Sequence, residues 1–201
     1  MLAIVLAAGR GRRVGGPKAL LDLAGVSALE RVLAALRGGG LETLRVVLGA
    51  EAEKVIAQID LSGVAVTHTA DIDLGQTASL KAGLALGPVD DDGFVVHPVD
   101  VALVESGSVA TLRSAFLSRA EETSIVVPSV AGRRGHPAFF AAPLAAEFAA
   151  LGDDEPAHRI VRRDPGRVSH VVMDRPWLIR DLDLPVDVEA ARAELRHRPL
   201  H

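Results

Sequence analysis

The chain has 201 residues, 49% of them apolar, a net charge of −4 and no cysteine. This length is enough for one buried core, so we expect a single domain over residues 1–201. The acidic balance argues against a broad surface for nucleic acid or anionic membrane, and the missing cysteines exclude disulfides, thiolate metal sites and a cysteine nucleophile.

The N-terminal stretch, residues 1–8, is apolar, but its positive charges follow it instead of preceding it, so it lacks the pattern of a signal peptide. No run of about 18 apolar residues predicts a membrane span. Because the absence of cysteine also suits a reducing compartment, we expect a cytoplasmic protein.

Short β-branched runs alternate along the chain with stretches whose apolar residues recur at helical spacing. The runs predict strands over residues 2–7, 44–48, 64–69, 94–97, 124–128 and 168–173. The stretches between them predict helices over residues 28–36, 51–59, 77–86, 109–120 and 143–151. This alternation predicts an α/β fold, a three-layer α/β/α sandwich with a mainly parallel, Rossmann-like sheet. Ligands of such sheets bind at the carboxyl ends of the strands.

The segment after the first strand, from Leu6 to Lys18, contains four glycines, three arginines and one lysine. Glycines let successive backbone N–H groups point at one anion, and the cationic side chains neutralise its oxygens. The dinucleotide fingerprint fails at Val14, and the P-loop pattern fails because Pro17 comes before Lys18 and Ala19 follows it. The segment therefore predicts a phosphate site of a third kind, unless it is an ordinary surface loop with solvated arginines.

The order of this segment, small residues followed by Gly-x-Gly-x-Arg and Pro-Lys, resembles the signature of the nucleotidyltransferases with a molybdenum-cofactor-transferase-like fold. That family includes molybdenum-cofactor cytidylyl- and guanylyltransferases and, more distantly, sugar-phosphate and erythritol-phosphate nucleotidyltransferases, all with the nucleotide-diphospho-sugar transferase type of sheet. The resemblance implies that the triphosphate and the pyrophosphate leaving group are bound by Leu6, Ala7, Ala8, Gly9, Gly11, Arg13 and Lys18. Val14 departs from the methionine usual in the family.

Two acidic positions resemble the family's metal ligands. Asp100 follows the fourth predicted strand, and Asp183 lies in a segment, Asp-Leu-Asp-Leu-Pro-Val-Asp, that resembles the family's Asp-Ile-Asp-Thr-Pro-x-Asp. The resemblance implies that both aspartates hold Mg²⁺, a hard cation that prefers carboxylate oxygens. Ala102 replaces a proline of the family pattern and Leu184 a threonine. Asp100 is alternatively a helix cap, and the second segment an acidic loop before the last helix.

Two further segments point to the substrates. Gly75 and Ser79 resemble the family's Gly-x-x-x-Ser-Leu loop, which borders the nucleoside, although these letters also suit a plain helix start. His136 stands in a Gly-His-Pro segment that the family places on the acceptor side, and its other interpretation is a structural histidine.

An acceptor phosphate is already anionic, so its attack on the α-phosphorus needs positioning and charge neutralisation more than a general base. We expect Mg²⁺-dependent transfer of a nucleoside monophosphate to a small phosphorylated acceptor, with Arg13, Lys18 and Asp100 as the catalytic residues. The opening from Leu6 to Gly9 resembles the cytidylyltransferase branch, which favours CTP and a molybdopterin-type acceptor. The alternatives are a sugar- or alcohol-phosphate nucleotidyltransferase and a nucleotide-binding regulatory module without turnover. The oligomeric state stays open.

Overall fold

The computed structural model describes residues 1–69, 75–152 and 155–197, and in this part of the chain eight strands form one sheet. The strands are β1 (Leu2–Ala7), β2 (Thr43–Leu48), β3 (Val64–His68), β4 (Phe94–Pro98), β5 (Ile125–Val130), β6 (Arg133–Arg134), β7 (Ala138–Phe140) and β8 (Val168–Val172). Their order is β3-β2-β1-β4-β7-β5-β6, and β8 also pairs with β5. β1 is parallel to β2 and β4, β2 is parallel to β3, and β5 is parallel to β8, whereas β7 runs antiparallel to both β4 and β5.

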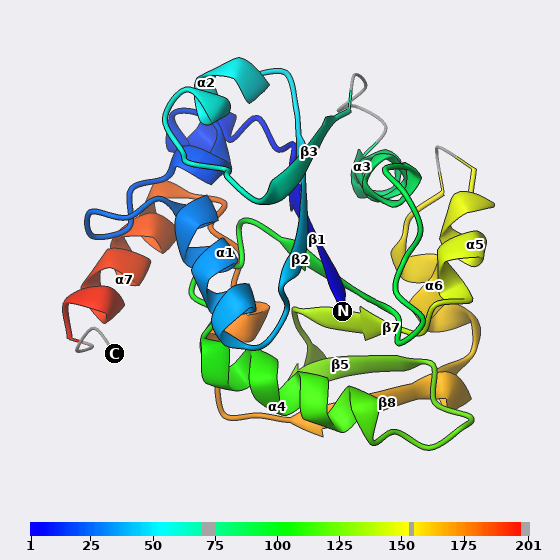
Figure 1. The fold of residues 1–201 in the computed structure, drawn as a ribbon. Helices are drawn as coiled ribbons and strands as arrows, with labels where there is room; N and C mark the ends of the chain where they lie inside the picture. The colour runs from blue at the N-terminus through cyan, green and yellow to red at the C-terminus, as the bar shows by residue number, and fades with distance from the viewer. Residues whose placement is uncertain (70–74, 153–154, 198–201) are drawn as a thin grey trace.

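Helices cover both faces of this sheet. They are α1 (Ala28–Gly38), α2 (Ala52–Ile56), α3 (Gly75–Ala85), α4 (Ser106–Leu117), α5 (Leu144–Ala149), α6 (His158–Arg163) and α7 (Pro185–Arg196). Helices α1, α4 and α7 bury side chains in one hydrophobic cluster, and α3, α5 and α6 do so in a second cluster. Figure 1 shows the two sets on opposite sides of the sheet. The expected three-layer α/β/α sandwich with a mainly parallel sheet is confirmed.

Strand β1 shows why its sequence is apolar almost throughout. Ala3 and Val5 belong to the first cluster, whereas Leu2 and Ile4 belong to the second, and all four are at most 1% exposed. A strand covered on both faces needs apolar side chains on both faces, so its sequence reads as a continuous hydrophobic run. Such a strand forms the centre of the sheet and ends at the glycine-rich segment.

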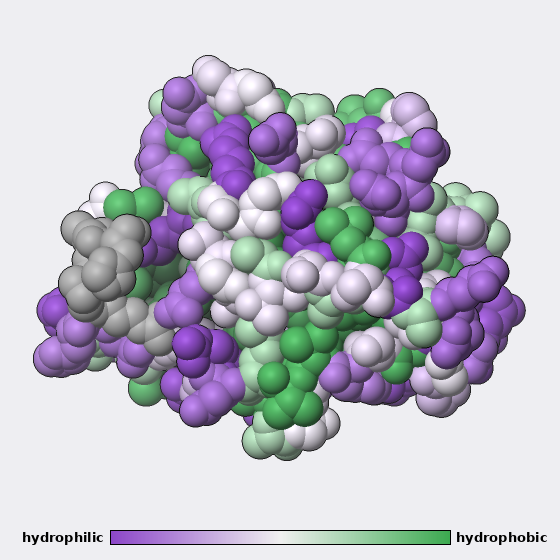
Figure 2. Space-filling view, turned by 60° about the horizontal axis from the view of Figure 1, so that its bottom comes forward, coloured by the Kyte–Doolittle hydropathy of each residue, from purple (hydrophilic) through white to green (hydrophobic). Residues whose placement is uncertain are grey.

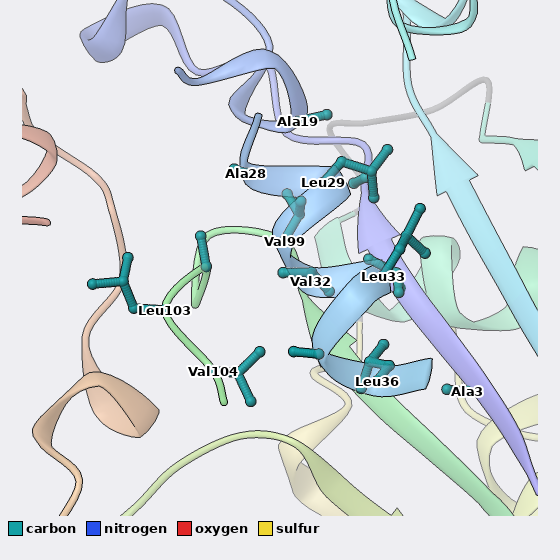
Figure 3. Close-up of a cluster of buried hydrophobic side chains, with 14 of the residues drawn as sticks. Ala3, Ala19, Ala28, Leu29, Val32, Leu33, Leu36, Val99, Leu103 and Val104 are labelled. Atoms are coloured by element: carbon teal, nitrogen blue, oxygen red, sulfur yellow. The ribbon is translucent and has the colours of Figure 1, made fainter. Parts of the chain in front are cut away.

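Helix α1 begins with a capping box, in which the Glu30 N–H donates to Ser27 Oγ at 3.2 Å and the Ser27 N–H donates to Glu30 Oε2 at 3.0 Å. Its buried side chains pack against the segment that follows β4, as Figure 3 shows for Leu29, Val32 and Val99. Fully burying one such leucine or valine contributes about 1.5–3 kcal/mol. This packing holds the backbone on both sides of Asp100.

Four of the strands and α-helices lie outside the predicted elements: β6, β7, α6 and α7. Helix α7 was expected only as a last helix after the acidic segment, without bounds. β6 has two residues and β7 has three, and β7 follows directly after Pro137, so neither shows an alternation long enough to recognise. In helix α6 only Ile160 is buried and Val161 is half-buried, and the other four residues are one histidine and three arginines. Helix α2 ends at Ile56, earlier than predicted, and the other predicted elements differ from the observed ones by a few residues at their ends.

The surface in the view of Figure 2 is hydrophilic along both sides, with hydrophobic residues gathered along its middle. Within residues 1–69, 75–152 and 155–197, no helix has both the length and the apolar composition needed to span a bilayer.

Candidate functional site

Three of the predicted residues meet at the carboxyl ends of β1 and β4. These strands are parallel neighbours, so the segments that follow them emerge side by side. Lys18 Nζ donates a hydrogen bond to Asp100 Oδ2 at 2.7 Å and a second, short one to Asp183 Oδ1. The N–H of Leu182 donates to the Asp100 carbonyl at 3.0 Å, which ties the C-terminal segment to the segment after β4. One cation thus connects residues from three distant parts of the chain.

The electrostatics of this cluster keep Lys18 charged. Burial alone would lower its pKa, but the attraction of Asp100 and the hydrogen bonds from both carboxylates outweigh burial and raise the Lys18 pKa overall. Asp181 lies near the same charged groups. Its partial burial, and then the negative charges of Asp100 and Asp183, raise the pKa of Asp181. The cluster therefore holds more negative than positive charge, which favours a further cation.

The donor set fits a hard divalent cation. Asp100 and Asp183 direct oxygens at one point, which Lys18 Nζ shares, and Asp100 Oδ1 is buried without a hydrogen-bond partner among the described residues. In the same part of the chain no group of three or more His, Cys, Asp or Glu side chains has metal-binding geometry. The protein would then supply two carboxylates, and phosphates and water the other ligands, as is usual for Mg²⁺. A metal ion held by Asp100 and Asp183 would compete with the Lys18 ammonium for these carboxylates.

The glycine-rich segment folds back on itself between β1 and Lys18. The Gly11 carbonyl accepts hydrogen bonds from the N–H groups of Val14 at 2.9 Å and Gly16 at 3.2 Å. Gly11 has φ +55°, and a Cβ placed on it would lie 1.9 Å from the Gly16 carbonyl oxygen. No residue with a side chain fits there unless the segment opens. Arg13 lies exposed on the 3₁₀ turn η1 (Arg12–Val14), and its contact with a phosphate stays a prediction.

A cavity of about 160 Å³ adjoins the cluster. Seven residues singled out from the sequence line it: Leu6, Ala8, Gly9, Lys18, Gly75, Ser79 and Asp100. Gly75 and Ser79 reach it from the first turns of α3, so this segment is the start of a helix and also lines the cavity; its contact with a nucleoside stays a prediction. Ala7 lines a smaller hollow behind the loop, together with Ala8 and Gly9. We call the larger cavity the phosphate cleft.

Sequence reasoning missed Gln76, Pro98 and Val99, which complete the lining of the phosphate cleft. Pro98 ends β4 and Val99 follows it, so the rule that ligands bind at the carboxyl ends of strands would have found both. Gln76 stands between the two residues singled out on α3, and its long polar side chain was the available signal.

His136 is half-buried and lies next to a second histidine, His97, which is fully buried. The His136 ring hydrogen-bonds to the Val96 backbone and packs edge-on against His97, with ring centroids 6.3 Å apart. Burial lowers the pKa of His136, and burial followed by the proximity of His136 lowers the pKa of His97 to about 3. Both rings are therefore neutral near pH 7. His136 also lines a second cavity beside the phosphate cleft, and its contact with an acceptor stays a prediction.

Comparisons with known proteins agree with this architecture. A family model described as a MobA-like NTP transferase domain matches residues 3–169. A curated relative, the nicotine blue oxidoreductase of Paenarthrobacter nicotinovorans, is 30% identical over 190 residues, which cover 90% of this chain and 85% of that protein.

Solved structures add two similar proteins. Rv0371c from Mycobacterium tuberculosis H37Rv superposes with a TM-score of 0.82 and 27% identity, covering 96% of this chain and 97% of that chain. That protein has also been solved in complex with manganese, with a TM-score of 0.80 and 26% identity. A nucleotidyl transferase from Methanothermobacter thermautotroptrophicus has a TM-score of 0.79 and 25% identity, covering 98% of each chain.

Proposed function

The chain belongs to the family of MobA-like NTP transferase domains, and we propose that it transfers a nucleoside monophosphate from a nucleoside triphosphate to a phosphorylated acceptor, releasing pyrophosphate. The observation that carries this proposal is the meeting of Lys18, Asp100 and Asp183 beside the glycine-rich segment. For the specific case we propose CTP, Mg²⁺ and a molybdopterin-type acceptor. The cytidylyltransferase-like opening from Leu6 to Gly9 supports CTP.

In this reaction an oxygen of the acceptor phosphate bonds to the α-phosphorus, and the bond from the α-phosphorus to the pyrophosphate oxygen breaks. The acceptor phosphate is already anionic at neutral pH, so no side chain has to remove a proton. The protein's task is to position the two phosphates and to neutralise the charge that moves onto pyrophosphate. Backbone N–H groups between Ala8 and Gly11 would hold the triphosphate, and Arg13 and Lys18 would stabilise the leaving group.

The two carboxylates would hold Mg²⁺, which supplies charge neutralisation at the phosphate oxygens. Asp100 suits this role because its backbone is fixed by buried neighbours and its Oδ1 has no donor within the described residues. Lys18 pairs with the same carboxylates, so its ammonium would become available beside the phosphate cleft if Asp100 and Asp183 held the metal ion. Lys18 would then pair with phosphate.

The test is release of pyrophosphate from each of the four nucleoside triphosphates, with and without Mg²⁺, in the presence of phosphorylated acceptors. We expect Asp100→Asn and Asp183→Asn to lower the rate at least about a hundredfold, because each removes a charged ligand that acts on the transition state. Asp187→Asn is the matched control. Asp187 lies in the same acidic segment, but its carboxylate accepts from the Leu184 N–H at 2.8 Å and caps α7. Equal losses in all three variants would contradict the assigned roles.

The whole-length similarity to a protein named nicotine blue oxidoreductase favours a second candidate, a redox reaction on an organic substrate. This candidate requires an electron donor, and a reduced nicotinamide dinucleotide offers the diphosphate that the glycine-rich segment suits. The test is oxidation of that dinucleotide by quinone-like dyes, measured as the loss of absorbance of the reduced dinucleotide. Steady turnover that Asp100→Asn leaves intact would favour it over nucleotidyl transfer. Nucleotide binding with neither activity would favour a regulatory module.

A further inference from the structure

The second cavity also has a volume of about 160 Å³ and lies on the side of the sheet that α3, α5 and α6 cover (Figure 1). Leu6, Gln76 and Pro98 line both this cavity and the phosphate cleft. A molecule that occupies it therefore lies next to the residues proposed to hold the triphosphate. We call it the apolar cavity.

Its walls come from the second hydrophobic cluster of the protein. Six buried side chains form them, one each from α3, β4, β5 and α5 and two from β7: Leu80, Val96, Val127, Phe148, Ala138 and Phe140. Charge is confined to the rim, where Arg134 and His158 are exposed. Among the described lining residues there is no carboxylate.

Size and polarity together select the kind of ligand. An apolar cavity of about 150 Å³ is known to stay dry and to bind benzene, so this cavity has room for a single ring or a short branched hydrocarbon. A sugar carries a hydroxyl on nearly every carbon, and each hydroxyl that loses water without gaining a partner costs about 1–3 kcal/mol. The six apolar wall residues offer such hydroxyls no side-chain donor or acceptor. The polar lining residues, Gln76, Arg134, His136 and His158, are too few to pair with every hydroxyl of a sugar.

We propose that the apolar cavity binds the body of the acceptor, and that this body is a compact apolar ring or branched hydrocarbon, not a polyhydroxylated sugar. The proposal rests on the proposed function in one respect, because the phosphate of this acceptor must reach the phosphate cleft. The Arg134 guanidinium at the rim offers that phosphate a cationic partner. The acceptor is thus a monophosphate with a small hydrophobic group. The lining does not suit the polar pterin of a molybdopterin-type acceptor, which the sequence resemblance alone supports, so the two acceptors are alternatives.

The experiment measures binding to the full chain by titration calorimetry, with benzyl phosphate, inorganic phosphate, glucose 1-phosphate and benzyl alcohol as probes. Ala157→Leu fills the apolar cavity from its half-buried edge, and Val161→Phe does so independently from α6. Ala146→Leu is the matched control, because Ala146 is exposed on α5 and lines a different groove.

Benzyl phosphate is expected to bind at least about tenfold more tightly than inorganic phosphate or glucose 1-phosphate, because its ring leaves water. Both filling variants should remove that advantage, and Ala146→Leu should keep it. Equal affinity for benzyl and inorganic phosphate would overturn the proposal. So would glucose 1-phosphate binding as tightly as benzyl phosphate, or filling variants that bind benzyl phosphate like the unaltered chain.

Benzyl alcohol separates this proposal from the proposed function, because it has no phosphate. If it binds and the filling variants abolish its binding while no triphosphate yields pyrophosphate, the cavity's specificity stands and nucleotidyl transfer fails. If pyrophosphate is released with some acceptor but neither benzyl probe binds, nucleotidyl transfer stands and the cavity's specificity is wrong.

Discussion

Replacing Gly11 by alanine should disable the glycine-rich segment while leaving the rest of the fold in place. Alanine at φ +55° costs about 1–2 kcal/mol relative to a residue without Cβ. Its Cβ would also lie 1.9 Å from the Gly16 carbonyl oxygen, so the segment must open. Opening breaks the hydrogen bonds from Val14 and Gly16 to Gly11, each worth about 1 kcal/mol. The strain and the two lost hydrogen bonds together amount to about 3–4 kcal/mol, or roughly 150-fold or more in triphosphate affinity.

Two other glycines allow the backbone strain of a positive φ to be measured without the steric clash of an added Cβ. Gly15 has φ +87° and Gly25 has φ +84°, and no atom of the described residues lies within 4 Å of a Cβ built on either. Gly15→Ala should carry the strain alone and weaken binding at least about tenfold less than Gly11→Ala. Gly25→Ala, outside the segment, should lower stability by a similar amount and leave affinity unchanged.

Titration calorimetry with a triphosphate and Mg²⁺ gives the affinities, and urea unfolding gives the stabilities. A folded Gly11→Ala variant that binds the triphosphate within about threefold of the unaltered chain would refute this reasoning.

Three further predictions concern charge. Lys18→Met should strengthen Mn²⁺ binding in the absence of nucleotide and weaken triphosphate binding, because the ammonium competes with the metal ion and pairs with phosphate. Electron paramagnetic resonance measures Mn²⁺ affinity and calorimetry measures triphosphate affinity; a variant in which both affinities rise or both fall would contradict this reasoning. The pKa of His97 is about 3 in the folded chain and 6.5 in the unfolded chain. The contribution of neutral His97 to the free energy of unfolding is therefore complete above pH 6.5 and falls as the pH drops toward 3, by about 1.5–2 kcal/mol between pH 6.5 and 5. His97→Gln should flatten this part of the plot of unfolding free energy against pH. Glu147→Gln should cost about 1 kcal/mol, because Arg167 donates to both Glu147 oxygens at 2.8 and 3.0 Å, whereas Glu189→Gln in an exposed pair should cost under about 0.5 kcal/mol in urea unfolding.

The parallel half of the sheet follows from the sequence because β1, β2 and β4 are runs of mostly buried residues between helices, and the half-buried β3 is still rich in β-branched residues. The antiparallel strand β7 does not, although it links β4 to β5 and so completes the sheet. Ala138, Phe139 and Phe140 are all buried, but three residues show no period, and Pro137 before them suggests a break. Packing on both neighbours, not local propensity, makes this segment a strand.

The candidate site also contains residues that the sequence places by a physical rule and residues that it does not. Lys18 and Asp100 follow strands of the parallel half, so the rule on carboxyl ends places them together without knowledge of the contacts. Asp183 was placed only by resemblance, because it follows no strand and reaches the cluster through the Leu182 hydrogen bond to Asp100. The apolar cavity was not predictable, since its walls include β7 and its edge includes α6, which have no recognisable pattern. His136 shows the same limit, because its buried neighbour His97 lies 39 positions earlier in the chain.

The measurement that tests the central claim most directly follows two labels through one reaction. The chain is incubated with Mg²⁺, phosphorylated small molecules and a nucleoside triphosphate labelled at either the α- or the γ-phosphorus. Nucleotidyl transfer at the cluster of Lys18 and Asp100 predicts that the α label enters an organic product and the γ label appears in pyrophosphate, both only with Mg²⁺ and an intact Asp100. A γ label that appears as inorganic phosphate or on the acceptor, or an α label that never leaves the triphosphate, would contradict the account.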